Sequence, residues 1–184
     1  MLSLLVFLAG TAYFLWVSRH ALRNPRSHGF YRFFAWEGIL GLVLLNVPVW
    51  ERDPFSPHQL ASWALLFISP VLALQAVRQL KRLGRPDEAQ RGEAELFGFE
   101  RTSALVTSGI FRHIRHPMYA ALLYLAWGAY LKAPSSPPGI ALAATTTALL
   151  LLTALRDEAE CRAHFGTAYD DYMRASKRFV PFVF

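Results

Sequence analysis

Residues 118–155 read MYAALLYLAWGAYLKAPSSPPGIALAATTTALLLLTAL. Two apolar runs, 118–131 and 139–155, flank a short segment rich in proline and serine, and such a segment is typical of a tight turn. The first run has only 14 residues. It becomes longer if His116 and Pro117 begin the helix, because proline is tolerated at the first helical position. The pattern predicts a helical hairpin.

Three further apolar runs precede this hairpin, at 2–17, 33–50 and 60–77. They contain 16, 18 and 18 residues, close to the ~17–25 residues of a membrane-spanning helix. The whole chain of 184 residues is 54% apolar and only 17% charged, whereas soluble domains average about 25% charged residues. We therefore predict an all-α polytopic membrane protein with about five transmembrane helices. A hydrophobic soluble bundle is the alternative.

The basic residues indicate an orientation. Of the 19 Lys and Arg residues, 17 fall in the connections 18–32, 78–117 and 156–184, and two fall in 51–59 and 132–138. Because basic residues concentrate on the cytoplasmic side, we expect the N-terminus outside and the C-terminus in the cytoplasm of a prokaryotic inner (plasma) membrane. The net charge of +6 then serves orientation and contact with membrane lipids, and we expect no nucleic-acid partner.

This pattern predicts a single membrane-embedded domain over 1–184. Residues 1–77 would form three N-terminal spans, 78–117 a cytoplasmic segment, 118–155 the hairpin, and 156–184 a cytoplasmic C-terminal helix and tail. No basic residue precedes the first run and no small-residue cleavage pattern follows it, so we interpret it as a retained anchor and not a signal peptide.

Several kinds of site are excluded by residue type. Cys161 is the only cysteine, so the chain can form neither an internal disulfide nor a cysteine-based metal site. The glycine-rich, Walker, HExxH and GxSxG motifs are absent. We expect no metal.

The stretch 105–119, LVTSGIFRHIRHPMY, carries the densest polar cluster. Arg112, His113, Arg115 and His116 stand just before an apolar helix. Such a cluster can bind an anionic or carboxylate-bearing ligand. Anchoring of the helix end among lipid headgroups is the alternative.

A second charged stretch, 156–172, reads RDEAECRAHFGTAYDDY. Arg156/Glu160 and Glu158/Arg162 stand at i,i+4 spacing, which predicts ion pairs along a solvated helix. The acidic residues could instead face a cationic ligand.

Glu37 lies inside an apolar run. It is either a site-facing carboxylate, paired with Arg32 or an arginine of 78–117, or an interfacial residue.

These two stretches together resemble the isoprenylcysteine carboxyl methyltransferase and phospholipid methyltransferase superfamily. The pattern LVTsGxYrxxRHPxY is similar to 105–119, and the later pattern EExxLxxxFGxxYxxY, followed by an arginine and a proline, is similar to 157–181. The resemblance covers about residues 96–184. It implies S-adenosyl-L-methionine bound at the cytoplasmic face, without a Rossmann domain, between the 96–119 segment and the C-terminal helix. The cofactor-binding residues that it implies are Leu105, Val106, Phe111, His116, Pro117, Met118, Tyr119, Asp157 and Glu158.

The resemblance further implies Arg115 and Glu158 as catalytic residues, and we add Arg156 and Glu37 as candidate substrate contacts. Asp157 stands where relatives have Glu, and Thr153 where prenylcysteine-methylating relatives have a substrate-binding Arg, which puts the prenylcysteine substrate in doubt. We therefore expect a methyltransferase for a lipophilic or lipid-tailed acceptor. The sequence does not identify the nucleophilic atom of the acceptor or the oligomeric state. An NADPH-dependent steroid-reductase-like enzyme and a non-enzymatic membrane assembly factor are the alternatives.

Overall fold

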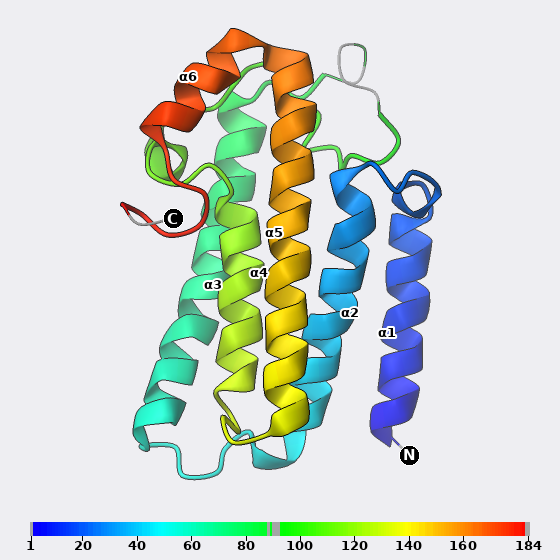
Figure 1. Cartoon of the computed structure of the whole chain (residues 1–184), viewed down its shortest axis with the longest axis vertical. Helices are drawn as coiled ribbons and strands as arrows, with labels where there is room; N and C mark the ends of the chain where they lie inside the picture. Colours follow the sequence, from blue (N-terminus) through cyan, green and yellow to red (C-terminus); the bar gives the residue numbers. More distant parts are fainter. Residues whose placement is uncertain (1, 88, 90–92, 183–184) are drawn as a thin grey trace.

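A computed structural model describes residues 2–87, 89 and 93–182. Over these residues the chain is all-α, as predicted, with isolated β-bridges and no strand (Figure 1). The α-helices are α1 Leu2–Ser18, α2 His28–Asn46, α3 Pro57–Leu83, α4 Pro117–Tyr130, α5 Pro137–Phe165 and α6 Thr167–Ala175.

Three helices in the described part of the chain are long and apolar enough to cross a membrane. They are α2 with its 3-10 extension to Val49, α3, and α5. The apolar helix α1 has 17 residues and α4 has 14. At ~1.5 Å per residue α4 is about 21 Å long, shorter than the ~30 Å hydrocarbon layer. The count of five spans and the orientation therefore stay predictions.

The outer surface of the bundle is apolar. Phe67 and Leu74 of α3 are 74% and 55% exposed, and Leu2 of α1 is 75% exposed. Contiguous apolar surface of this kind is unusual on a soluble protein. In a membrane this apolar surface would face lipid tails, so its exposure would carry no free-energy cost.

The helices lie side by side in the order α1, α2, α5, α4, α3, and α6 crosses one end (Figure 1). The most extensive contacts are those of α2 with α5 and of α3 with α4. The predicted hairpin is confirmed, because α4 begins at Pro117 and α5 follows a short turn in which the Ser136 hydroxyl accepts the Gly139 N–H. The helix α5 continues through 155 into the charged stretch and ends at Phe165.

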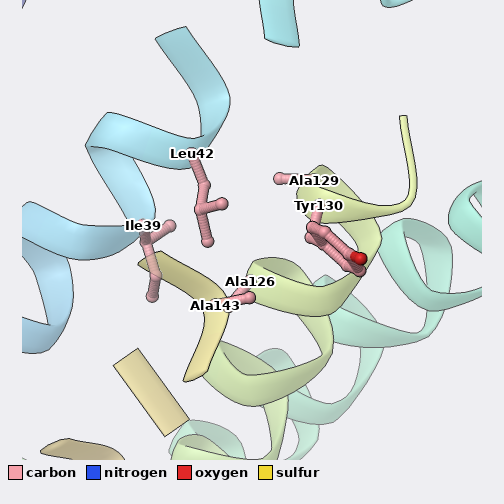
Figure 2. Packing of buried hydrophobic residues seen from close by; sticks show 6 residues of the cluster. All are labelled: Ile39, Leu42, Ala126, Ala129, Tyr130 and Ala143. Carbon is pink, nitrogen blue, oxygen red and sulfur yellow. The ribbon is translucent and has the colours of Figure 1, made fainter. Parts of the chain in front are cut away.

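Small residues allow the helices to approach closely in the interior of the bundle, toward the hairpin turn. Leu42 and Ile39 of α2 pack against Ala126 and Ala129 of α4 and Ala143 of α5 (Figure 2). Association of helices in lipid depends on such packing, since burying apolar surface from lipid brings little gain. The close-packed core joins α2, α4 and α5, and none of its buried residues lines the cleft described below.

Lys132 fastens the hairpin to α3 at the end away from α6. Its Nζ donates to Gln59 Oε1 at 2.9 Å and lies 3.3 Å from the centroid of the Trp63 ring. Only 2% of Lys132 is exposed. A cation–π contact of a desolvated ammonium is worth ~2 kcal/mol or more, so this lysine is part of the packing.

Candidate active site

A cleft opens at the end of the bundle that carries α6. Its empty volume is about 680 Å³, which includes the part open to solvent. Its walls come from the segment 96–106, the start of α4, the last turns of α5, and α6. The lining residues are Leu80, Leu96, Glu100, Thr102, Leu105, Val106, Phe111, Arg115, His116, Pro117, Met118, Tyr119, Asp157, Cys161, Phe165, Tyr169 and Tyr172.

One wall is aromatic. Val106, Phe111, Tyr169 and Tyr172 form a buried cluster with Ala76 of α3. The Tyr172 hydroxyl donates to the Phe111 carbonyl at 2.7 Å, which joins α6 to the turn before α4. Burial raises the pKa of Tyr169 and of Tyr172 well above the ordinary value, so both remain neutral phenols at neutral pH.

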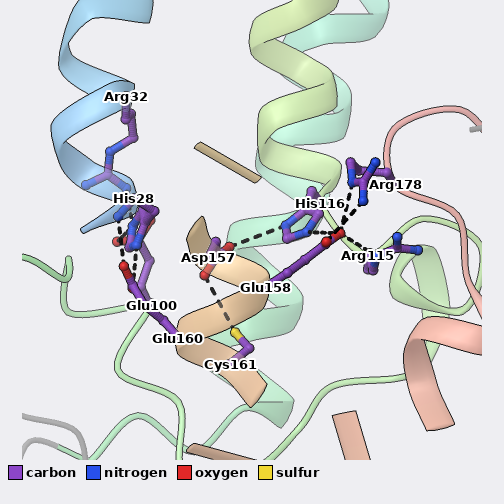
Figure 3. A network of polar contacts seen from close by, with 10 residues as sticks. All are labelled: His28, Arg32, Glu100, Arg115, His116, Asp157, Glu158, Glu160, Cys161 and Arg178. Atoms are coloured by element: carbon purple, nitrogen blue, oxygen red, sulfur yellow. Dashed lines mark hydrogen bonds and ion pairs between the residues drawn. The ribbon is translucent and has the colours of Figure 1, made fainter. Parts of the chain in front are cut away.

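His116 lies between two carboxylates of α5 (Figure 3). Its Nδ1 is 3.3 Å from Asp157 Oδ2, and its Nε2 is 3.3 Å from Glu158 Oε1. Burial alone lowers the pKa of His116, but the two carboxylates outweigh it and the pKa is raised. An imidazolium with a carboxylate at each nitrogen is thus the favoured form.

Glu158 is the centre of a buried cationic cage. Its Oε1 accepts from Arg115 Nε at 2.8 Å and from Arg178 Nε at 2.9 Å, and its Oε2 accepts from Arg178 Nη2 at 3.1 Å. Arg115 Nη1 also donates to the Ser176 carbonyl at 2.6 Å. The backbone supports this arrangement, since His116 N donates to the Arg178 carbonyl. The C-terminal segment is thereby fixed beside the cleft.

A second buried cluster joins α2 to the cleft (Figure 3). Arg32 Nη1 lies 2.6 Å from Glu100 Oε1, and the His28 imidazole lies 2.7 Å from Glu160 of α5. Glu160 also accepts the His28 backbone N–H at 2.8 Å and so caps α2. Burial alone raises the pKa of Glu100, but Arg32 and His28 hold it below its usual value. Glu100 is therefore a carboxylate.

Most of the sequence-predicted residues are brought together. The described residues that line the cleft include Arg115 and all of the predicted cofactor residues except Glu158, whose carboxylate lies behind His116 and Arg115. Arg156 is exposed, with its guanidinium 5.8 Å from the Tyr31 ring.

Glu37 accepts a hydrogen bond from Thr11 of α1 at 2.8 Å. Among the described residues Glu37 is thus paired with Thr11, and not with Arg32 or an arginine of 78–117 as suggested, while Arg32 pairs with Glu100.

The predicted i,i+4 ion pairs on α5 are also replaced. Glu160 contacts His28, Glu158 contacts Arg115 and Arg178, and Arg162 pairs with Asp170 at 2.7 Å. Exposed pairs along a helix are worth only ~0.3–0.5 kcal/mol. Glu158 and Glu160 therefore take partners from other elements, whereas Arg162–Asp170 is an exposed pair between α5 and α6.

Sequence reasoning missed the contribution of α2 and, within the expected 96–119 segment, did not single out Glu100. Glu100 lines the cleft, and His28 and Arg32 hold it from α2, yet none of these three stands in a recognisable motif. Tyr169 and Tyr172 did stand in the second motif, and the Y-x-x-Y spacing was the available signal. Both lie on the cleft face of α6.

The described residues include one group with the spacing of a metal site. Ligand atoms of His28, Asp157 and Glu160 lie within 4.8 Å of one another. Within this group His28 and Glu160 are 2.7 Å apart, and this contact connects α2 to α5.

Residues 58–168, more than half of the chain, match the phospholipid methyltransferase family. The chain belongs to the phospholipid methyltransferase family. This family lies within the isoprenylcysteine carboxyl methyltransferase-like superfamily, so the resemblance noted in the sequence is confirmed. No curated protein and no solved structure shows a significant match to the chain.

Membership of the phospholipid methyltransferase family and the three long apolar helices identify a membrane methyltransferase. The matched range begins at the start of α3 and ends in α6. It therefore leaves out α1 and α2, and also Arg178.

Proposed function

We propose that this phospholipid methyltransferase family member uses S-adenosyl-L-methionine to methylate a lipophilic or lipid-tailed acceptor. The observation that carries the proposal is the cleft itself. Residues from two motifs that are distant in sequence, 105–119 and 157–172, line one cleft. The runner-up activity, reduction by NADPH, has no comparable support.

The donor set of the cleft fits this cofactor. Apolar and aromatic walls from Val106, Phe111 and Tyr169 suit an adenine ring. The carboxylates of Asp157 and Glu100 suit a sulfonium and an ammonium group, since opposite charges stabilise one another in a partly buried site. Arg115 reaches the same cleft and can orient a carboxylate through its planar guanidinium.

Glu158 and His116 act by fixing the positions of other side chains. Glu158 is enclosed by Arg115, Arg178 and His116, so we assign it as a positioning residue that fixes the Arg115 guanidinium and the His116 ring. Arg115 then contacts the cofactor or an anionic acceptor. His116, charged between its two carboxylates, keeps Asp157 oriented toward the cleft.

The cofactor, when bound, would supply an electrophilic methyl group. Methyl transfer is an in-line displacement, so the chain has to align the acceptor and exclude water. Pro117, Met118 and Tyr119 form the first turn of α4, which continues into the apolar hairpin. The cleft thus adjoins the apolar part of the bundle, which supports entry of an acceptor with a lipid tail from the membrane side.

Thr153 counts against a prenylcysteine acceptor. The Thr153 side chain is buried and donates to the Leu149 carbonyl at 2.8 Å. Threonine supplies no cation at this position to bind a prenylcysteine carboxylate. The concentration of basic residues in alternate connections supports a cleft on the cytoplasmic side of a prokaryotic inner membrane.

Ligand-dependent stability of the detergent-purified protein tests the cofactor. S-adenosylhomocysteine at ~100 times its Kd should add about 2.7 kcal/mol to the free energy of unfolding, and NADPH should add nothing. Asp157→Asn should weaken binding of S-adenosylhomocysteine. Asp171→Asn makes the same change at an exposed position of α6 and should leave binding unchanged. Stabilisation by NADPH alone, in folded protein, would reject the proposal.

A further inference from the structure

The segment 96–102, which we call the strap, forms one wall of the cleft without belonging to any helix. Leu96, Glu100 and Thr102 of the strap line the cleft. One end is tied by an isolated bridge between Thr102 and Pro86. The rest of the strap depends on side-chain contacts for its position.

Those contacts come from α2. The Arg32–Glu100 distance of 2.6 Å joins side chains that are 5% and 10% exposed. The Arg32 guanidinium also lies 4.3 Å from the centroid of the Phe97 ring. Glu100 Oε2 accepts the Phe97 N–H at 2.9 Å, which closes a turn of the strap around the carboxylate.

Arg32 is thus the closer of two α2 side chains that hold the cleft wall, since His28 Nε2 lies 3.8 Å from Glu100 Oε2. If a buried pair loses one partner, the other charge is left uncompensated in a desolvated place. Glu100 would then turn toward water and pull the strap out of position. Arg32 lies outside the matched range 58–168, so the family match does not assign it any role.

We propose that Arg32 is a positioning residue for the methyl-transfer site, acting through Glu100 to hold the strap against the cofactor. The inference rests on the proposed function as far as the cofactor is concerned. Through Glu100, the helix α2 would thus contribute to cofactor affinity. Arg32 itself does not line the cleft.

The single cysteine of the chain gives a readout that is independent of any cofactor. Cys161 lines the cleft on α5, so its rate of reaction with a maleimide reports how open the cleft is. Arg32→Gln should speed this labelling roughly tenfold and raise the Kd of S-adenosylhomocysteine by a similar factor, since small displacements in a site carry such costs. Glu100→Gln should change the labelling rate and the Kd in the same way. The double variant should change them little more than either single variant does.

Three controls separate positioning from general stability. Arg32→Lys keeps the charge and should recover most of the affinity. Arg23→Gln changes an exposed arginine of the connection before α2 and should alter neither readout. Leu42→Ala opens the core around α2, α4 and α5 and should lower thermal stability while leaving the labelling rate and the Kd unchanged.

Each outcome decides for or against the positioning role. If Leu42→Ala shifts both readouts as much as Arg32→Gln, or Arg32→Lys rescues nothing, Arg32 is only structural. If Arg32→Gln fails to fold, Arg32→Lys and Glu100→Gln give the same comparison. If the unaltered protein does not bind S-adenosylhomocysteine, the proposed function fails, whereas the labelling rates still accept or reject the link between Arg32 and the strap.

Discussion

The carboxylate of Glu158 shows how a buried acid can be tolerated beside a membrane helix. Its side chain is 6% exposed and is contacted by Arg115, His116 and Arg178. Three donors from two other parts of the chain satisfy it. The attraction offsets the desolvation of these charges only as long as all partners are in place.

Replacing Glu158 with Gln should therefore be costly although the shape is conserved. The cationic side chains around it would lose their counter-charge, and breaking a buried ion pair costs ~3–5 kcal/mol. Thermal or denaturant unfolding in detergent measures the loss. Glu51→Gln, at an exposed position, should change stability by less than ~0.5 kcal/mol. Equal effects of the two changes would refute the caged role of Glu158.

The pKa of His116 gives a pH dependence with a definite sign. Because the pKa is raised in the folded state, His116 contributes stability that is fully present below its unfolded pKa of ~6.5. That contribution is lost as the pH rises through the folded pKa. The stability difference between the unaltered protein and His116→Gln should thus be largest near pH 6 and shrink toward pH 9. A difference that grows with pH would show that the neutral imidazole is the stabilising form.

The junction of α5 and α6 depends on a glycine. Gly166 has φ 60° and ψ −138°, a backbone conformation that L side chains rarely adopt, while no atom lies within 4 Å of the position a Cβ would take. Gly166→Ala should cost ~1–3 kcal/mol through backbone strain alone. It should also weaken cofactor binding, because α6 carries Tyr169 and Tyr172 into the cleft.

Gly98 provides the matched control for that change. It also has free space where the methyl group of an alanine would lie, but it lacks the positive φ. Gly98→Ala should be neutral or slightly stabilising, by up to ~1 kcal/mol. Unfolding curves of the two variants distinguish these effects, and similar curves would mean that the Gly166 conformation carries no strain.

Local sequence predicted the elements well where one physical signal dominates. The hairpin 118–155 follows from two apolar runs and a proline-rich turn, and the helix start at Pro117 follows from the tolerance of proline there. Helix ends were less predictable. The helix α2 begins at His28, five residues before the apolar run, because Glu160 of α5 caps its first turn.

The site was predictable only within its motifs. The predicted cofactor residues within 105–119, together with Arg115 and Asp157, line the cleft as expected, since the motif records their types and spacing. Glu100, His28 and Arg32 were not predictable, because a charged residue in a loop or at a helix start has no periodicity to reveal a distant partner. The i,i+4 pairs of α5 failed for the same reason, as tertiary partners replaced local ones.

The two ends of the molecule differ in chemistry. One end carries the cleft, the buried charge clusters and most of the basic side chains, whereas the other carries the proline-rich turn and Lys132 between Trp63 and Gln59. Lys132 is one of the two basic residues in the predicted outer connections. Because Lys132 is buried by packing, it adds no exposed charge at this end. The difference in exposed charge between the two ends is therefore larger than the residue counts alone indicate.

This asymmetry predicts an orientation that labelling of intact cells can measure. In a Cys161→Ser background, a cysteine at Ser135, exposed in the hairpin turn, should react with a membrane-impermeant maleimide from outside. A cysteine at Arg174, exposed on α6, should react only after the membrane is opened. Labelling of Arg174→Cys in intact cells, with Ser135→Cys protected, would place the cleft on the outer side. A cytoplasmic methyl donor could then not reach it, and the proposed cofactor would have to be abandoned.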